Sequence, residues 1–192
     1  MERIQVIVGS TRPNRFGEKP ARWVAEHLAV RGDLHVETID LRDYPLPFFE
    51  QPLPPAYSLR DYPDDAIARW GAKVDQADGF VFITSEYNHG YPASLKNAID
   101  HLFPEWHRKP VAFVGYGNVG GARAIEQLRE VVVELEMAPL RHAVHILPDV
   151  MRPAMQTEGY DSSLFEPLLP KLQLLGDDLA WWARTLAAGR AS

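Results

Sequence analysis

The stretch that most constrains the fold is 80–102, where a strand, a polar turn and a helix follow one another. Residues 80–83 are uniformly apolar and rich in β-formers, a pattern typical of a strand buried on both faces. After the polar turn 85–91 the apolar residues recur at the spacing of one helical face, at Leu95, Ala98, Ile99 and Leu102. The turn therefore follows the carboxyl end of a strand, which is where open α/β sheets bind ligands.

The same unit recurs along the chain. Four further apolar runs predict strands at 4–8, 35–40, 111–114 and 140–147. Helical periodicity predicts helices that end near Arg31, Asp78 and Met137, and a last helix over 172–186 after an irregular segment.

This alternation of strands and helices predicts a parallel sheet with helices on both faces. Five strands fit the flavodoxin-like order 2-1-3-4-5 better than a six-stranded dinucleotide fold. We therefore expect residues 1–192 to form one α/β domain, a flavodoxin-like three-layer sandwich.

One segment breaks the alternation. Residues 44–63 are too rich in proline for a helix or a central strand, and we interpret them as an ordered excursion across the surface. Its apolar side chains need burial: Phe48, Phe49, Leu53 and Tyr57. We expect a homodimer, with Phe48, Phe49 or the last helix at the interface.

Charge and composition exclude several classes of function. The net charge of −6 argues against nucleic acid or an anionic membrane as a partner, although residues 1–22 are locally basic. The absence of cysteine excludes disulfides and thiolate chemistry. The chain has no signal-peptide pattern and no apolar run near the ~18 residues that span a bilayer, so we expect a cytoplasmic protein.

Three polar loops follow the first, third and fourth strands and should open on the same edge of the sheet. The first loop, 10–17, combines a hydroxyl pair, Arg12, Arg15 and a helix N-terminus, all able to bind a phosphate. A plain surface turn with solvated arginines is the alternative.

The second and third loops offer flat rings and backbone groups. For the second loop, the alternative is a plain strand-to-helix turn, in which Asn88 and Gly90 provide left-handed backbone geometry. The third loop matches G-x-G-x-x-G over 115–120, but the match falls in the fourth strand–helix unit and lacks an acidic ribose partner. Together the loops predict a ligand with one phosphate and one large planar ring, and flavin mononucleotide (FMN) is the obvious candidate.

The motifs also resemble a known family. The first loop 9–15, the turn with Ser85, Glu86, Tyr87 and Asn88, and the following 90–100 are similar to the NADPH-dependent FMN reductase family, over roughly residues 3–147. Members of that family reduce quinones, azo dyes, nitro compounds and chromate. The resemblance implies a flavodoxin-like fold, bound FMN, and usually a dimer or tetramer.

The resemblance also implies residue roles. Ser10, Arg12, Arg15 and Phe16 would hold the phosphate end of FMN. Glu86, Tyr87 and Asn88 would line the isoalloxazine, and the opposite wall would be Gly115, Tyr116, Gly117 and Asn118. Ser85 stands where the family often has proline, and Asn118 where it often has serine. His89 is expected to face solvent.

The chemistry expected from these features belongs to the cofactor. A hydride would pass from NADPH or NADH to flavin N5 and then to a small-molecule acceptor, with no side chain as acid or base and no metal. Two alternatives are a flavodoxin-type electron carrier and a nicotinamide-binding dehydrogenase that uses the glycine loop. The basic first loop and the proline-rich segment favour a walled catalytic site over a carrier.

Overall fold

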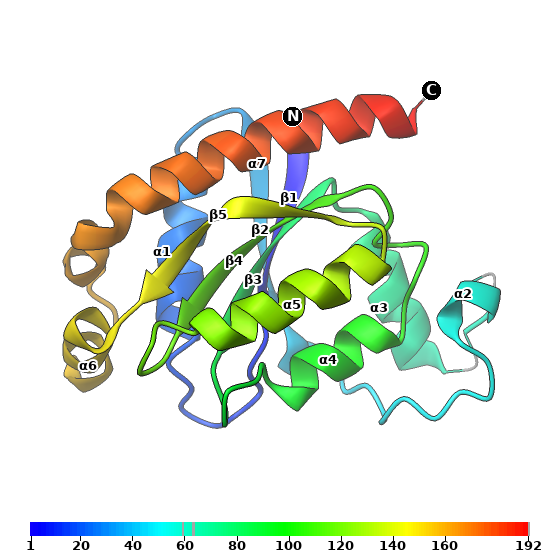
Figure 1. Ribbon diagram of the computed structural model, residues 1–192, viewed down its shortest axis with the longest axis horizontal. Helices are drawn as coiled ribbons and strands as arrows, with labels where there is room; N and C mark the ends of the chain where they lie inside the picture. Colours follow the sequence, from blue (N-terminus) through cyan, green and yellow to red (C-terminus); the bar gives the residue numbers. More distant parts are fainter. Residues whose placement is uncertain (59, 63, 192) are drawn as a thin grey trace.

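The fold is built on one five-stranded sheet. The computed structural model describes residues 1–58, 60–62 and 64–191. The strands pair in parallel, in the order β2-β1-β3-β4-β5 (Figure 1). Their bounds are β1 (Glu2–Val8), β2 (Leu34–Asp40), β3 (Gly79–Ser85), β4 (Pro110–Tyr116) and β5 (Ala138–Ile146). The expected fold class and strand order are confirmed.

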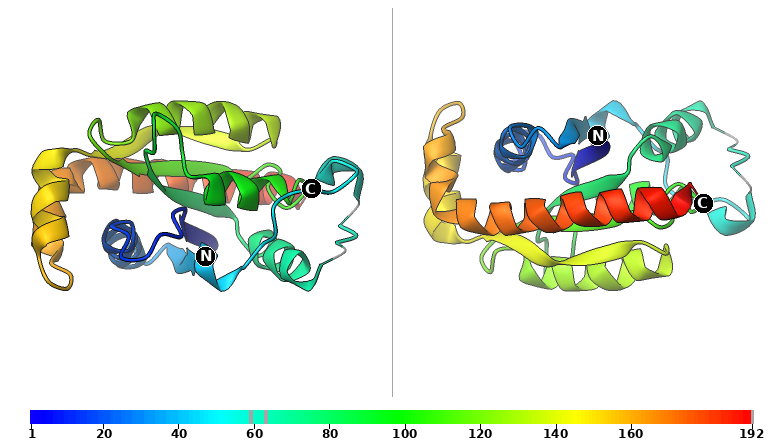
Figure 2. Two further views of the ribbon diagram at one scale, coloured as in Figure 1. Left: turned by 90° about the horizontal axis from the view of Figure 1, so that it is seen from below. Right: turned by 90° about the horizontal axis from the view of Figure 1, so that it is seen from above.

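Helices cover both faces of the sheet and complete three layers (Figure 2). One face carries α1 (Glu18–Ala29), α6 (Pro148–Gln156) and α7 (Leu169–Arg190). The other face carries α3 (Asp65–Asp75), α4 (Ala93–Asp100) and α5 (Ala122–Glu134). Three shorter pieces lie in connections: the 3-10 turn η1 (Leu41–Asp43), α2 (Pro55–Ser58) and the 3-10 helix η2 (Ser162–Leu168).

The central strands are apolar because both of their faces are covered. Alternate side chains of a strand point to opposite faces, so Val6 packs under α1 and α7 while its neighbour Ile7 packs under α3 and α4. In β3 every residue is buried. Burial of each large aliphatic or aromatic side chain contributes about 1.5–3 kcal/mol, so the continuous apolar runs become the central strands.

The segment 148–168, expected to be irregular, contains two helices, α6 and η2. Pro148 does not merely close β5; it begins α6, where a proline without an N–H is tolerated in the first turn. Pro139 likewise lies inside β5 instead of preceding it, which is possible because β5 is an edge strand.

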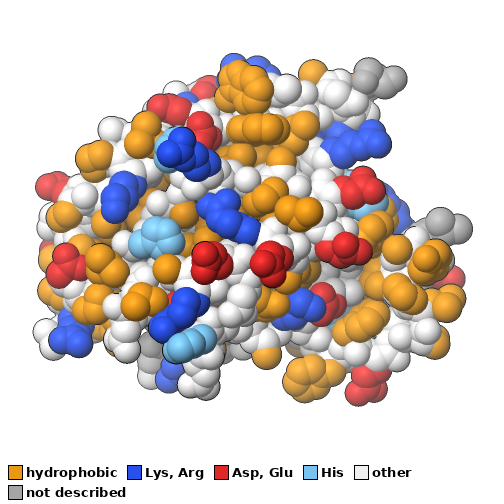
Figure 3. Space-filling model, in the orientation of Figure 1, with side chains coloured by type: hydrophobic (Ala, Val, Ile, Leu, Met, Phe, Trp, Pro, Cys, Tyr) orange, Lys and Arg blue, Asp and Glu red, His pale blue; other side chains and the backbone are white. Residues whose placement is uncertain are grey.

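The proline-rich segment differs from expectation in its side chains. Phe48, Leu53 and Tyr57 are 77%, 59% and 72% exposed, so they are not buried within the single chain. Of the four apolar side chains, only Phe49 packs, with its ring 5.5 Å from that of His101. Hydrophobic side chains gather around α2 at the right of Figure 3. Pro63, at the end of this segment, lies outside the described residues.

The segment is nevertheless anchored to α4 through its backbone. Asn97 accepts a hydrogen bond from Phe49 N (2.9 Å) and donates one to Pro47 O (2.8 Å). His101 Nε2 lies 2.8 Å from the same carbonyl oxygen. Main-chain pairing of this kind fixes the path of 47–49 while leaving the Phe48 ring exposed.

Within the part of the chain that the structure describes, none of the helices has the length and apolarity needed to traverse a bilayer.

The core under α7 gives a test of this packing. Leu175 is fully buried, whereas its neighbour Leu174 is 51% exposed. Leu175→Ala should lower the free energy of unfolding by about 2–5 kcal/mol, because it leaves a cavity between α7 and the sheet. Leu174→Ala, the matched control, should change it by less than about 0.5 kcal/mol. Urea denaturation followed by circular dichroism measures both, and equal losses would contradict the assigned orientation of α7.

Candidate active site

Three loops meet at the carboxyl edge of the sheet, at the lower side of Figure 1. The strands end almost level because Val8 pairs with Ile83, and Ile83 pairs with Val114. The loops after β1, β3 and β4 therefore start side by side, as the view from below in Figure 2 also shows. Neighbouring parallel strands in register place their following turns at one edge, which is the usual ligand-binding position.

The first and second loops are joined by hydrogen bonds. Ser10 Oγ lies 2.7 Å from Tyr87 Oη, and the Arg12 guanidinium lies over the Tyr87 ring at 5.6 Å from its centroid. Gly9 contributes main-chain bonds: its N–H donates to Ile83 O (2.9 Å) and its carbonyl accepts from Ser94 Oγ (2.6 Å). The start of α4 is thereby linked to the end of β1.

These contacts also change the electrostatics of Tyr87. Burial acts to raise the pKa of the phenol, but contacts with Ser10, Ser85 and Arg12 outweigh it and hold the pKa below its usual value. The charge of Arg12 and the hydroxyl groups of Ser10 and Ser85 therefore favour the ionised form of the Tyr87 phenol.

The second loop is a tight turn whose tip is exposed. Tyr87 and Gly90 exchange two backbone hydrogen bonds, of 2.8 and 3.0 Å. The two residues between them have positive φ, 50° at Asn88 and 73° at His89, which is the pattern of a type I′ turn. The expected left-handed geometry is thus confirmed for Asn88, whereas the second left-handed residue is His89 and not Gly90. The turn leaves Asn88 and His89 exposed.

Glu86 connects the second loop to the third. Its side chain is only 5% exposed and forms an ion pair with Arg123 of α5. The carboxylate also accepts the backbone N–H of Arg123 (3.2 Å), and the Glu86 N–H donates to Tyr116 O (3.1 Å). Glu86 therefore caps the N-terminus of α5, which has no cap from its own N-cap residue Gly121. Sequence analysis missed Arg123, because nothing local marks it as a partner of Glu86. His89 Nε2 also lies 2.9 Å from Arg123 Nη1.

The glycines of the third loop serve mainly close packing. A Cβ on Gly120 would come within 2.7 Å of His145 Cβ, and one on Gly115 within 2.6 Å of Gly120 O. Gly117 and Gly120 both have positive φ, 148° and 64°, but Gly117 is less crowded, since a Cβ there would come no nearer than 3.4 Å to Glu86 Cβ. Gly120 is therefore needed for close packing, whereas Gly117 and Asn118 lie at the tip.

The first and third loops meet through aromatic rings. Phe16 and Tyr116 pack edge to face at 5.1 Å between centroids, and the Tyr116 hydroxyl reaches the backbone at Gly17. Burial raises the pKa of Tyr116 to about 12. Each loop thus contacts the other two, and the three form one rim.

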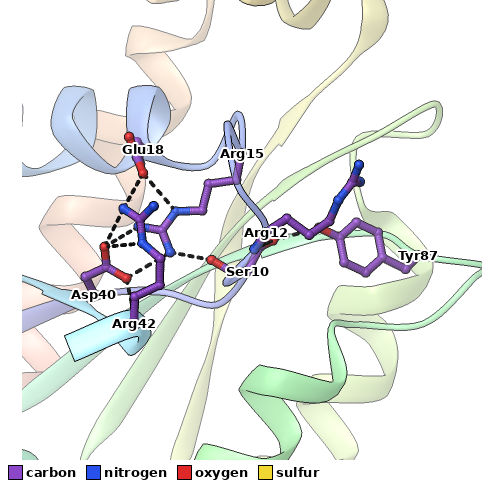
Figure 4. Close-up of polar contacts among 7 residues, drawn as sticks. All are labelled: Ser10, Arg12, Arg15, Glu18, Asp40, Arg42 and Tyr87. Carbon is purple, nitrogen blue, oxygen red and sulfur yellow. Dashed lines mark hydrogen bonds and ion pairs between the residues drawn. The ribbon is translucent and has the colours of Figure 1, made fainter. Parts of the chain in front are cut away.

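Arg15 is part of an ion-pair cluster at the end of β2 (Figure 4). Its Nη1 donates to Asp40 Oδ1 at 2.9 Å, its Nη2 pairs with Asp40 Oδ2, and Nη1 also donates to Ser10 O. Glu18 and Arg42 complete the cluster. Burial acts to raise the pKa of Asp40, but hydrogen bonds from Arg15 and Arg42 outweigh it and lower the pKa to about 2. Sequence analysis did not single out Asp40.

Exposure separates the expected site residues into two groups. The first group lies at the rim, and its residues are exposed or half-buried: Arg12, Glu86, Tyr87, Asn88, Gly117 and Asn118. Those that are buried beneath it are Ser10, Arg15, Phe16, Ser85, Gly115 and Tyr116. The second group is placed to support the rim.

Residues 3–149 match the family of NADPH-dependent FMN reductases. The chain belongs to this family. It is 38% identical over 161 residues to an NAD(P)H-dependent FMN reductase of Schizosaccharomyces pombe, covering 80% of each chain. It is 27% identical over 189 residues to a quinone reductase of Pseudomonas putida, covering 94% of each. Among solved structures, the flavoenzyme NAD(P)H:(acceptor) oxidoreductase FerB of Paracoccus denitrificans has the same fold, with a TM-score of 0.72, 24% identity and coverage of 96% and 98%.

These findings confirm several expectations from the sequence: the family, the flavodoxin-like fold, an enzyme of the FMN-dependent NAD(P)H oxidoreductase class, and FMN with NAD(P)H as its cofactors. They favour neither the electron carrier nor the dehydrogenase that reads the glycine loop.

The Asp40 cluster predicts a specific pH dependence of stability. The folded-state pKa of about 2 lies below the unperturbed value of 3.8, so the carboxylate stabilises the fold above about pH 4, and this contribution is lost as the pH falls toward 2. The difference in unfolding free energy between wild type and Asp40→Asn should be constant from pH 7 to 5 and shrink between pH 4 and 2. Denaturant titrations at each pH measure it, with the exposed Asp43→Asn as control. A difference that does not change below pH 4 would refute this assignment.

Proposed function

We propose that the rim holds FMN and that the chain uses it to pass electrons from NAD(P)H to a small acceptor, such as a quinone, an azo or nitro compound, or free flavin. The observation that carries this proposal is the mutual contact of three loops at one edge of the sheet, with a basic first loop and two backbone-rich walls. The residues fit FMN, because the exposed Arg12 and the N-terminus of α1 can bind a phosphate, and the two other loops offer surfaces suited to a planar ring.

The residues divide by role. Arg12 and the N-terminus of α1 would bind the phosphate, with Ser10, Arg15 and Phe16 shaping the loop beneath. Around the ring, one wall would be the turn formed by Glu86, Tyr87 and Asn88, of which only Asn88 is exposed, and the other Gly117 and Asn118. The buried Ser85, Gly115 and Tyr116 would support these walls.

Bound FMN would supply the two-electron chemistry, accepting a hydride from NAD(P)H and returning it to the acceptor. The protein's part is to bind and orient. The backbone N–H of Asn88 would donate to the ring, because that of Tyr87 already donates to Gly90 O, and the positive charge of Arg12 would stay at the phosphate end. No acid or base is assigned to a side chain.

The acceptor, assembly and location belong to the proposal as well. The named relatives reduce quinones or flavin, which supports a small-molecule acceptor. We propose that residues 1–192 act as one FMN-binding domain in a cytoplasmic homodimer or homotetramer. The exposed side chains of Phe48, Leu53 and Tyr57 support an interface formed by the proline-rich segment, because large apolar side chains that gather on one part of a surface often mark a protein contact.

A spectrum and an acceptor assay test the function. Purified protein should be yellow with FMN, and it should oxidise NADPH or NADH steadily only when a quinone is present. An electron carrier would show FMN but almost no turnover. Protein that stays colourless and does not bind added FMN would overturn the proposal.

Light scattering tests the assembly. The wild type should have at least twice the chain mass of 21.7 kDa at micromolar concentration. Phe48→Asp should yield monomer, because a charge would be buried in the apolar interface. Val30→Asp, at a residue 83% exposed on the far end of α1, should leave the mass unchanged. If Trp181→Asp on α7 gave monomer while Phe48→Asp did not, the interface would lie on α7.

A further inference from the structure

The first loop holds two arginines with different surroundings. The Arg15 side chain is only 2% exposed, and its guanidinium is shared among Asp40, Ser10 O and Glu18, the last at 3.2 Å. A guanidinium has five N–H donors in a fixed plane, so a group held from three sides cannot turn outward to a ligand without breaking these bonds. Arg15 is therefore placed to hold the loop and not to bind a phosphate.

Arg12 has the opposite surroundings. It is exposed, and among the residues that the structure describes it forms no ion pair. Its guanidinium lies 5.6 Å from the centroid of the Tyr87 ring (Figure 4). Figure 4 shows its side chain pointing away from the cluster around Asp40. A phosphate that reached this loop would meet the free charge of Arg12 first.

Ser10 connects the two arginines. Its carbonyl oxygen accepts from Arg15 Nη1, while its hydroxyl accepts the Arg12 N–H at 3.4 Å and bonds Tyr87 Oη at 2.7 Å. The peptide between Ser10 and Thr11 thus has its carbonyl held toward Arg15. A peptide's N–H points opposite to its carbonyl, so this arrangement turns the Thr11 N–H away from the ion-pair cluster.

Asp40 is what keeps Arg15 in this position. It lies at the end of β2, outside the loop, and it contacts Arg15 through both carboxylate oxygens. Arg42 bonds the same carboxylate, with its backbone N–H at 2.8 Å and its Nε at 3.0 Å. A bidentate pair of this kind fixes orientation as well as distance.

We propose that Asp40 is a positioning residue for phosphate recognition: through Arg15 it sets the Ser10 peptide, so that the loop presents its N–H groups and Arg12 to the 5′-phosphate of FMN. This rests on the proposed function. It reverses the equal roles that the sequence gave the two arginines, assigning the phosphate contact to Arg12 and an internal role to Arg15.

Comparison of FMN with riboflavin, which lacks the phosphate, isolates this effect from general stability. The flavin-free full chain is titrated with each flavin, and quenching of flavin fluorescence gives the affinity. Asp40→Asn should weaken FMN about tenfold, equivalent to about 1.4 kcal/mol, and riboflavin less than about twofold. Arg12→Gln should show the same selectivity, with a shallower salt dependence of FMN affinity than in the wild type.

Two exposed residues provide matched controls. Asp43→Asn removes the same charge three residues further on, and Arg22→Gln removes a cation from the exposed side of α1. Both should leave the FMN-to-riboflavin ratio unchanged. Thermal unfolding of each variant shows that it is folded at the titration temperature, so that lost binding is not lost structure.

The outcomes separate this inference from the proposed function. Wild type that binds neither flavin overturns both. Wild type that binds FMN, with Asp40→Asn binding FMN equally well, overturns this inference alone. Equal weakening of FMN and riboflavin by Asp40→Asn also overturns it, because the residue would then act on the whole site and not on the phosphate.

Discussion

The burial of β1, β3 and β4 on both faces, in parallel and in register, is the constraint on which the rest of the structure depends. Each of these strands is covered by helices on either side, so most of its residues are apolar, and the buried polar residues Gln5, Thr84 and Ser85 are exceptions. Parallel pairing brings all carboxyl ends to one edge. Polar residues of the chain that follow these strands are therefore concentrated on a single rim, whatever their separation in sequence.

The rim is held together by side chains that belong to different loops. Ser10 bonds Tyr87, Glu86 bonds Arg123, and Phe16 packs on Tyr116, so each pair of loops has its own contact. Several of these groups are buried, and a buried polar group is stable only when partnered. The interlocking is consequently cooperative, because loss of one partner leaves another unsatisfied. Such a rim is preorganised for a rigid planar ligand, which lowers the cost of ordering the loops on binding.

Charge on the rim is distributed unevenly. The carboxylates near the first loop are neutralised by Arg15 and Arg42, which leaves Arg12 as the free cation of that loop within the described residues. An otherwise acidic protein thus presents a local positive charge at a helix start. On the adjoining surface, the segment 47–49 is held to α4 by its backbone while apolar side chains stay exposed, which places an apolar patch next to the site.

The sequence by itself determined the strand order, the layers and the three loops that form the site, because apolar period and turn chemistry are local properties. It predicted an irregular segment before the last helix, where the structure has α6 and η2, since a proline such as Pro148 can end one element or begin the next. It also could not show that Arg15 turns inward to Asp40 or that Glu86 caps α5, because those partners are 25 and 37 residues away. Only the tertiary structure decides such pairings, since the energy of a charge depends on the groups that folding brings around it.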